Sequence, residues 1–345
     1  MNEVIRVLVV DDSAFLRKVV REMLSRSPYL DVVGAARDGV EALEMVEQLK
    51  PHVVTCDLTM PRLDGVGFVR EQMNRRPLPI LIVSVANQDA ALALEALEAG
   101  AVDFVQKPTA LASEELLQIR EELVEKVKAA ALASMQKGPI ELVPPAPLPD
   151  FPKPQSHRFD VVVIGISTGG PQALRMMLPQ LPANFPVPIA IVLHMPVGFT
   201  ALFAEKLNEI CTLTVKEAAE GDVMMPGHAL IAQAGKHLTF ERKGEAVVAH
   251  LTRQPAEMLH RPSVDVLFQS AAQVYGERVL GVVMTGMGSD GRQGAAWIKA
   301  EGGVILTEAE VSCIIYGMPR SVVEAGLSDG AVPLGAMAKG IMNRL

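Results

Sequence analysis

Acidic and basic side chains recur directly after apolar runs in the first third of the chain, where strands are expected to end. Asp11 and Asp12 follow "VIRVLVV", Asp57 follows "HVVTC" and Lys107 follows "VDFVQ". The carboxyl ends of parallel strands meet at one edge of a sheet, so these side chains are expected to converge there. Clustered carboxylates repel one another unless a hard cation lies among them, and an all-oxygen site with open positions suits Mg²⁺.

A phosphoryl group is the ligand that fits such a site. The cation would make Asp57 a phosphoryl acceptor, while Lys107 and the hydroxyl of Ser84, in "PILIVSV", would contact the phosphoryl oxygens. Taken singly, each aspartate is explained equally well as a cap after a strand. Suitable residues in the right order at successive strand ends favour the functional interpretation.

A second set of reactive residues begins at "VVVIGISTGG", where an apolar run leads into a glycine-rich turn. Ser167 in G-x-S-x-G has the strand-to-helix context of a nucleophile elbow, although such turns also bind phosphate through helix N-terminal amides. The dinucleotide fingerprint does not fit, because no acidic residue ends the next predicted strand. That strand ends in His194.

Ser167 and His194 are far enough apart for one β-α-β crossover, which would place them at the ends of neighbouring parallel strands. Asp290, in "TGMGSDG" after another apolar run, is then expected to accept a hydrogen bond from Nδ1 of His194. Otherwise Asp290 is an ordinary turn residue before glycine. A Ser-His-Asp set is defined by roles and geometry, and this chain order differs from that of the α/β-hydrolases.

The elements that must hold these residues are α/β throughout. In residues 1–125, five apolar runs alternate with helix-period segments and predict a five-stranded, doubly wound parallel sheet. In residues 157–345, "DVVVIGI", "PIAIVLH" and "RVLGVVMTG" predict a mostly parallel sheet, and "HALIAQAGKHLTFERKGEAVVAHLT" predicts a small antiparallel hairpin insert with a Lys-Gly turn.

Residues 126–156 are expected to extend the last helix of the first domain and then form a linker. Leu116, Ile119, Leu123 and Val127 share one face of that helix. The segment "PIELVPPAPLPDFPKP" contains seven prolines, each of which fixes its own φ and disfavours helix in the residue before it.

Composition excludes several classes of protein. The 345 residues are 49% hydrophobic, enough for two cores, and the net charge of −8 argues against nucleic-acid binding. No apolar stretch reaches about 18 residues and "MNEVIRVLVVDDS" lacks the features of a signal peptide, so we expect a cytoplasmic protein without direct membrane insertion. Cys56, Cys211 and Cys313 lie far apart and predict neither disulfides nor zinc.

With "VVDDS", "DLTMPRLDG", Ser84 and "KP", residues 1–125 resemble the receiver domain of response regulators. The resemblance implies that Asp57 is the phosphoacceptor and that Ser84 and Lys107 respond to its phosphorylation together with the switching aromatic Phe104. It also implies Mg²⁺ ligands: Asp11, Asp12, Asp57 and the backbone carbonyl of Thr59. Thr59 departs from the acidic residue that close relatives often carry there.

Residues 157–345 resemble the catalytic domain of chemotaxis protein-glutamate methylesterases, on "GISTGGPQAL", "LHMPVGFT", "HRPSVDVLF", "TGMGSDG" and "YGMPRSV". The resemblance implies that Ser167 attacks the ester carbonyl, His194 transfers the proton and Asp290 orients the imidazolium. The backbone N–H of Met287 would be an oxyanion donor, and the esterase chemistry would need no cofactor.

Two residues depart from the pattern of that family. Ile166 replaces the small residue usual beside the nucleophile and is expected to narrow the pocket, and Leu193 replaces the glutamine usual before the histidine. His260 in "HRPS" is interpreted as a structural residue at a helix entry.

Together the two resemblances imply a phosphorylation-activated enzyme that removes methyl esters from glutamates of methyl-accepting chemoreceptors and deamidates receptor glutamines. A chemotaxis histidine kinase would be the phosphodonor, and the unphosphorylated receiver would cover the catalytic cleft. Two rival outputs are weighed. A DNA-binding output is opposed by the acidic charge, and a non-catalytic nucleotide-binding module on "GISTGG" is opposed by His194 and by the missing ribose-binding acid.

Overall fold

The computed structural model describes residues 4–84, 90–107, 113–131 and 158–345. Contacts between residues divide the chain into two compact units, Met1–Glu141 and Leu142–Leu345. The proline-rich linker lies outside the described residues. The domain boundaries expected at residues 125 and 157 therefore stay predictions.

The first unit contains a five-stranded parallel sheet in the order β2-β1-β3-β4-β5, as predicted. Helices α1 and α5 contact each other, while α2 contacts α3 and α3 contacts α4. In α5, Leu123 and Val127 are buried, in line with the apolar face expected for that helix. The bounds are β1 Ile5–Val10, α1 Ala14–Ser25, β2 Leu30–Ala36, α2 Gly39–Leu49, β3 Val53–Cys56, α3 Gly65–Arg75, β4 Ile80–Ser84, α4 Ala90–Glu98, β5 Asp103–Gln106 and α5 Ser113–Ala131.

Side-chain caps end the loops that follow the first three strands. The hydroxyl of Ser13 accepts a hydrogen bond from the first turn of α1, and the carboxylates of Asp38 and Asp64 do the same for α2 and α3. After Asp64 the chain needs a glycine, because a Cβ on Gly65 would lie 2.1 Å from the carbonyl oxygen of Asp57. The start of α3 thus packs directly on the backbone of Asp57.

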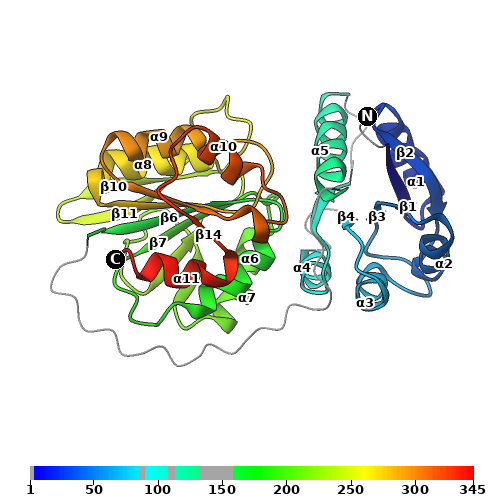
Figure 1. Ribbon diagram of the computed structural model, residues 1–345, viewed down its shortest axis with the longest axis horizontal. Coiled ribbons are helices and arrows are strands. Elements are labelled where there is room, and N and C mark those ends of the chain that lie inside the picture. Colours follow the sequence, from blue (N-terminus) through cyan, green and yellow to red (C-terminus); the bar gives the residue numbers. More distant parts are fainter. Residues whose placement is uncertain (1–3, 85–89, 108–112, 132–157) are drawn as a thin grey trace. The chain divides into compact units, whose positions relative to one another are not determined.

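The second unit contains a seven-stranded sheet in the order β14-β13-β12-β6-β7-β9-β8, with every neighbouring pair parallel. Figure 1 shows α8, α9 and α10 on one face of this sheet and α6, α7 and α11 on the other. The bounds are β6 Val161–Ile166, α6 Gly170–Met177, β7 Ile189–Leu193, α7 Thr200–Ile210, β8 Thr214–Glu217, β9 His228–Ile231, α8 Val264–Tyr275, β12 Val279–Val283, α9 Arg292–Ala300, β13 Val304–Glu308, α10 Met318–Glu324, β14 Ala331–Val332 and α11 Leu334–Met342. Short 3₁₀ turns span Leu178–Gln180, Gly276–Arg278 and Glu310–Ser312.

The predicted antiparallel hairpin is formed by β10 (His237–Lys243) and β11 (Ala246–Thr252). Gly244 follows the last residue of β10 and has a positive φ of 63°, which suits a tight turn. The start of the segment expected to alternate as hairpins forms β9 instead, which pairs in parallel with β7 and β8.

Strand β6 lies where the direction of winding changes. From β6 the chain continues to β7 on one side, whereas β12 lies on the other side and is followed by β13 still farther out. The register pairs Ile166 with Leu193 and Gly165 with Val283. The segments after β6, β7 and β12 therefore meet at one edge, where open α/β sheets bind ligands.

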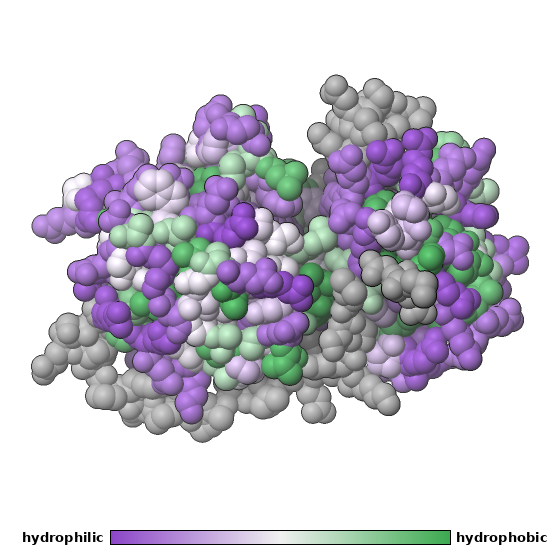
Figure 2. All heavy atoms as spheres, turned by 45° about the horizontal axis from the view of Figure 1, so that its top comes forward, coloured by the Kyte–Doolittle hydropathy of each residue, from purple (hydrophilic) through white to green (hydrophobic). Residues whose placement is uncertain are grey.

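Hydrophilic side chains cover most of the face seen in Figure 2, with smaller hydrophobic areas among them. Within the part of the chain that the structure describes, no helix combines the length and the apolar character needed to cross a membrane.

We expect Gly165→Ala to destabilise the second unit by about 1–3 kcal/mol, because a Cβ there would lie 2.2 Å from Cγ1 of Val264 and would push α8 off the sheet. The single tryptophan, Trp297, lies in α9, so its fluorescence during urea unfolding monitors this unit alone. Gly335→Ala is the matched control, since a Cβ there meets nothing within 4 Å. Equal urea midpoints for both variants would contradict the close packing of α8 on β6.

Candidate active site and phosphorylation site

Ser167 and His194 occupy equivalent positions at the ends of neighbouring strands. Ser167 directly follows β6 and its N–H donates to the carbonyl of Thr285 at 3.0 Å. His194 directly follows β7 and its N–H donates to the carbonyl of Ile166 at 3.2 Å. The segment after β12 also packs closely on Ser167, since a Cβ on Gly286 would lie 2.8 Å from Cβ of Ser167.

His194 and Asp290 are joined by a hydrogen bond of 2.8 Å between Nε2 and Oδ2. The expectation that Nδ1 would face Asp290 is therefore wrong. Strand spacing brings the two residues together, but the rotation of the imidazole ring and the path of the loop after β12 decide which nitrogen meets the carboxylate. Nδ1 of His194 is buried and has no hydrogen-bond partner among the described residues.

The carboxylate of Asp290 also lies against the start of α8. It accepts hydrogen bonds from the hydroxyl of Ser263 at 2.9 Å, from the N–H of Val264 at 2.8 Å and from the N–H of Asp265 at 2.9 Å. Burial opposes ionisation, but the bond from His194 and these amides lower the pKa of Asp290 well below its usual range. Asp290 is therefore an anion wherever the protein is folded at ordinary pH.

The segment after β12 is held from two sides. The carbonyl of Gly286 accepts from the N–H groups of Gly317 and Met318 at 3.0 and 2.8 Å, and the N–H of Thr285 donates to Glu308 at 2.9 Å. The N–H of Met287, which follows, donates to no acceptor among the residues that the structure describes. The resemblance to the methylesterases implies that this N–H is an oxyanion donor, and that role stays a prediction.

The first unit brings its predicted acidic residues together. Oxygens of Asp11, Asp12 and Asp57 lie within 4.8 Å of one another, and Nζ of Lys107 lies 2.9 Å from Asp11 and 2.7 Å from Asp57. Burial raises the pKa of Asp57 although Lys107 opposes that shift, and the two carboxylates raise the pKa of Lys107 against its burial. Three carboxylates against one ammonium leave net negative charge and oxygen ligands, which fit Mg²⁺.

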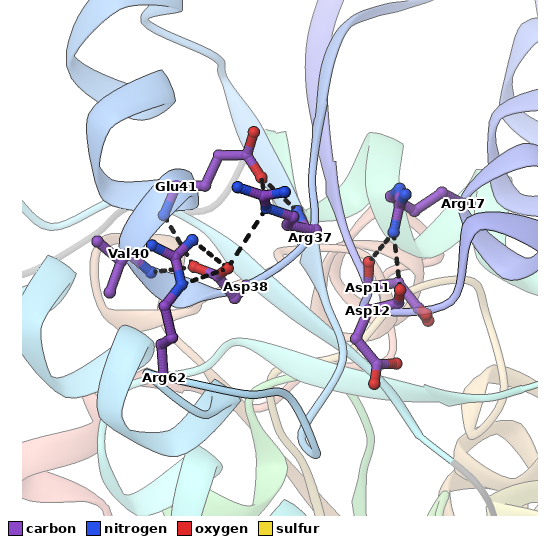
Figure 3. A network of polar contacts seen from close by, with 8 residues as sticks. All are labelled: Asp11, Asp12, Arg17, Arg37, Asp38, Val40, Glu41 and Arg62. Atoms are coloured by element: carbon purple, nitrogen blue, oxygen red, sulfur yellow. Dashed lines mark hydrogen bonds and ion pairs between the residues drawn. The ribbon is translucent and has the colours of Figure 1, made fainter.

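The side chain of Arg17 holds the backbone of Asp11 and Asp12 in place (Figure 3). Nη1 of Arg17 donates to the carbonyls of Asp11 and Asp12 at 2.7 and 3.0 Å. The loop after Asp57 is tied to the start of α2, because Arg62 pairs with the buried carboxylate of Asp38. Arg62 has a positive φ of 64°, which is unusual for a residue other than glycine.

The remaining predicted residues of the receiver are placed as follows. The carbonyl of Ser84 accepts from the N–H of Lys107 at 2.7 Å, and its buried hydroxyl has no partner among the described residues. Phe104 is buried in β5, and the ammonium of Lys126 lies 5.7 Å from its ring centre. Thr59 is exposed. The switching roles of Ser84 and Phe104 and the carbonyl ligand from Thr59 stay predictions.

Comparison with known proteins decides the family. Residues 162–341 match the model of the CheB methylesterase family, and residues 7–120 match the response regulator receiver domain. Protein-glutamate methylesterase/protein-glutamine glutaminase 5 of Myxococcus xanthus is 49% identical, over 96% of both chains. The enzyme of that name from Lawsonia intracellularis is 40% identical, over 99% of both chains. This chain belongs to the CheB methylesterase family.

A solved structure agrees with this assignment. The CheB methylesterase catalytic domain of Thermotoga maritima is 39% identical, with a TM-score of 0.53, and the match covers 54% of this chain and 99% of that one. The chain is thus a protein-glutamate methylesterase/protein-glutamine glutaminase of chemotaxis that carries a receiver domain. The second unit is therefore a methylesterase domain, and neither the DNA-binding nor the nucleotide-binding output describes it.

The two departures from the CheB pattern lie against the start of α6. Ile166 and Leu193 are fully buried, and a Cβ on Gly170 would lie 2.6 Å from Cδ1 of Leu193 and 3.0 Å from Cγ1 of Ile166. The two larger side chains therefore pack on the start of α6. The expected narrowing of the pocket by Ile166 stays a prediction.

Sequence reasoning missed several residues around the reactive groups. His260, interpreted as a helix-entry residue, stacks on His194 with ring centres 4.2 Å apart and an angle of 21°. Glu308 is fully buried at the end of β13, and burial raises its pKa although the N–H of Thr285 and the hydroxyl of Ser312 bond to it. The sequence signal that could have pointed to Glu308 is an acidic residue at the end of a mostly apolar run, "VILTE".

Asp265 is a further residue that was not singled out. Its Oδ1 accepts hydrogen bonds from the N–H groups of Gly291 at 2.9 Å and Gly294 at 2.7 Å, at the start of α9. Burial raises the pKa of Asp265 to about 6; the amide of Gly294 opposes this shift and the negative charge of Asp290 adds to it.

A carboxyl group with a raised pKa in the folded state holds its proton to higher pH than in the unfolded chain. Stability of the second unit should therefore fall as pH rises from the ordinary value of 3.8 through about 6. After allowance for partial exposure the loss due to Asp265 is about 1–2 kcal/mol.

Asp265→Asn removes this titration, so the difference in unfolding free energy between the variant and the native protein should change by that amount between pH 4.5 and pH 8. Urea unfolding followed by Trp297 fluorescence measures it. A difference that does not depend on pH would contradict the raised pKa.

Proposed function

We propose that Ser167, His194 and Asp290 hydrolyse the methyl ester. Oγ of Ser167 attacks the ester carbonyl carbon while Nδ1 of His194 takes the hydroxyl proton. The bond from carbon to the methoxy oxygen then breaks, and the proton passes from His194 to that oxygen, so methanol leaves. Asp290 stabilises the imidazolium through its bond to Nε2.

Water completes the reaction. It attacks the acyl carbon and gives a proton to His194, and that proton passes to Oγ of Ser167 as the acyl bond breaks and the glutamate carboxylate leaves. The N–H of Met287 would stabilise the oxyanion at both stages. With a glutamine substrate the same steps release ammonia in place of methanol, and no cofactor takes part in either reaction.

The observation that carries this proposal is the state of the His194 ring. Asp290 occupies Nε2, while Nδ1 is buried and has no partner among the described residues. A buried nitrogen without a hydrogen bond costs free energy, so its presence in a folded protein calls for a function that uses it. Accepting the proton of Ser167, at the end of the adjacent strand, is such a function.

The receiver would control this activity through Asp57. Mg²⁺ held by Asp11, Asp12, Asp57 and the carbonyl of Thr59 would neutralise charge on the incoming phosphoryl group. Lys107 and the unpartnered hydroxyl of Ser84 would then bond to that group, and Phe104 would change its packing in response. A chemotaxis histidine kinase would be the phosphodonor.

The substrates would be glutamyl methyl esters and glutamines of methyl-accepting chemoreceptors, reached from the cytoplasm. We infer that the unphosphorylated receiver covers the catalytic cleft and that phosphorylation shifts the equilibrium toward an uncovered state. A linker between the domains makes such docking intramolecular, so it would not depend on protein concentration.

Ser167→Ala should lower turnover about 10⁶-fold, as loss of the nucleophile does in other serine hydrolases, because no other group can form the acyl-enzyme. Methanol release from membranes carrying methylated chemoreceptors measures the activity. Phosphorylation of Asp57 by a small phosphodonor, followed in the same preparation, shows that the variant is folded. Near-normal methanol release would exclude Ser167 as the nucleophile.

Asp57→Ala should leave basal activity intact and abolish activation by a small phosphodonor, which in the native protein should require Mg²⁺. The segment from about residue 155 onward should exceed the unphosphorylated chain in activity, by roughly 100-fold if the cover is docked about 99% of the time. Equal rates for the segment and the intact chain would show that the receiver does not occlude the cleft.

A further inference from the structure

Two helices at the catalytic edge cap each other across the chain. The carboxylate of Asp290, just before α9, accepts the N–H groups of Val264 and Asp265 in the first turn of α8. The carboxylate of Asp265, in turn, accepts the N–H groups of Gly291 and Gly294 at the start of α9. Asp290 thus satisfies amides of α8, the helix that contains Asp265. Asp265 in turn satisfies amides at the start of α9, the helix that follows Asp290.

We propose that Asp265 is a positioning residue of the esterase reaction, holding the turn at residues 290–294 so that Asp290 stays bonded to His194. This inference rests on the proposed role of Asp290. In this proposal the side chain of Asp265 contacts neither His194 nor the scissile bond. It acts through the loop that carries Asp290.

Neither helix has a cap of its own that could replace this arrangement. The N-cap of α9 is Gly291, which has no side chain and a positive φ of 98°. The N-cap of α8 is Ser263, whose side chain makes no bond to its own helix and donates to Asp290 instead. Buried amides at a helix start need an acceptor, so the acceptor must come from the neighbouring helix.

The helices lie close enough for these bonds because glycines at the start of α9 face larger residues of α8. A Cβ on Gly294 would lie 2.5 Å from Cβ of Phe268 and 3.0 Å from Cα of Asp265, and a Cβ on Gly291 would lie 2.9 Å from Cγ1 of Val264. This close packing fixes the position of the start of α9 relative to α8. With Oδ1 of Asp265 on its backbone, both the side chain and the backbone of the 290–294 turn are fixed to α8.

The bonds of Asp290 leave it little freedom once the turn is held. Oδ1 accepts from Ser263 and Asp265, and Oδ2 accepts from Val264 and His194. A shift of the turn by a fraction of a hydrogen-bond length would lengthen several of these bonds at once. The bond to His194 is the one on which proton transfer depends, and an error of about 1 Å in such a contact can cost roughly 100-fold in rate.

Charged and titratable groups surround this pair from several elements. Burial opposes the ionisation of both carboxylates, and the amides of α8 and α9 supply donors for them. Nδ1 of His237 in β10 accepts a hydrogen bond from the N–H of Ser263 at 3.2 Å, which helps to hold the start of α8 in place. Among the described residues, His194 after β7 bonds to Asp290, and His237 in β10 lies close enough to Asp290 to interact with its charge. His260 stacks on His194, and Arg261 interacts with His237.

The test compares Asp265→Ala, which removes the acceptor, with Asp265→Asn, which keeps an oxygen at the same place. For the intact, phosphodonor-activated chain we expect the alanine variant to lower kcat about 10- to 100-fold with KM within about threefold, and the asparagine variant to recover most of that loss. The folded fraction is measured at the assay temperature by Trp297 fluorescence. The far-downfield NMR resonance of the His194 ring N–H should broaden or move in the alanine variant and return in the asparagine variant.

Asp329→Ala is the matched control. Its carboxylate also accepts a backbone N–H, from Ile305 at 2.8 Å, but it lies near the start of β13, at the opposite edge of the sheet. That variant should lose stability while kcat and the NMR resonance stay unchanged. An alanine variant of Asp265 that is folded and within twofold of native kcat would overturn the proposal, as would an asparagine variant as impaired as the alanine one.

Failure of this inference and failure of the proposed function are distinguishable. Asp290→Asn, assayed alongside, should lower activity about 10⁴-fold if Asp290 has its proposed role. If that loss occurs while Asp265→Ala is unaffected, only the positioning role of Asp265 is excluded.

Discussion

The buried negative charge of Asp290 is the feature around which the catalytic unit is arranged. A carboxylate out of water needs hydrogen-bond donors, and here the first turn of α8 supplies two amides and a hydroxyl beside the imidazole of His194. Meeting that need brings α8 tightly over β6 and α9. Gly165, Gly291 and Gly294 are the residues that make this approach sterically feasible.

Both units place reactive groups at the carboxyl edge of a parallel sheet, but they balance buried charge differently. In the receiver a buried ammonium, Lys107, lies between Asp11 and Asp57, and the remaining negative charge suits a divalent cation. In the catalytic unit, His194 and the amides of α8 stabilise the negative charge of Asp290 and keep it ionised. The first arrangement is suited to receiving a phosphoryl group, and the second to stabilising an imidazolium.

Much of this could be predicted from the sequence because the signals are local. Apolar runs separated by helix-period segments indicated both parallel sheets, and the proline-rich segment indicated two domains. Side chains placed directly after predicted strands, such as Asp57, Lys107, Ser167 and His194, could be assigned to one edge because strand direction and alternation determine where a strand-end residue lies. Strands β8 and β14 escaped detection, since such short segments gain their structure from pairing rather than from their own pattern. For β9 the extended segment was expected, but its parallel pairing with β7 and β8 was not.

The fold class, the family and the strand ends that carry the reactive residues could therefore be inferred from the sequence, because each depends on short runs of neighbouring positions. Folding in three dimensions fixes which nitrogen of His194 meets Asp290, the stacking of His260 on that ring, and the mutual capping of two helices by Asp265 and Asp290. These contacts join segments far apart in the chain, and they depend on side-chain rotation and helix packing. Local spacing carries no information about either.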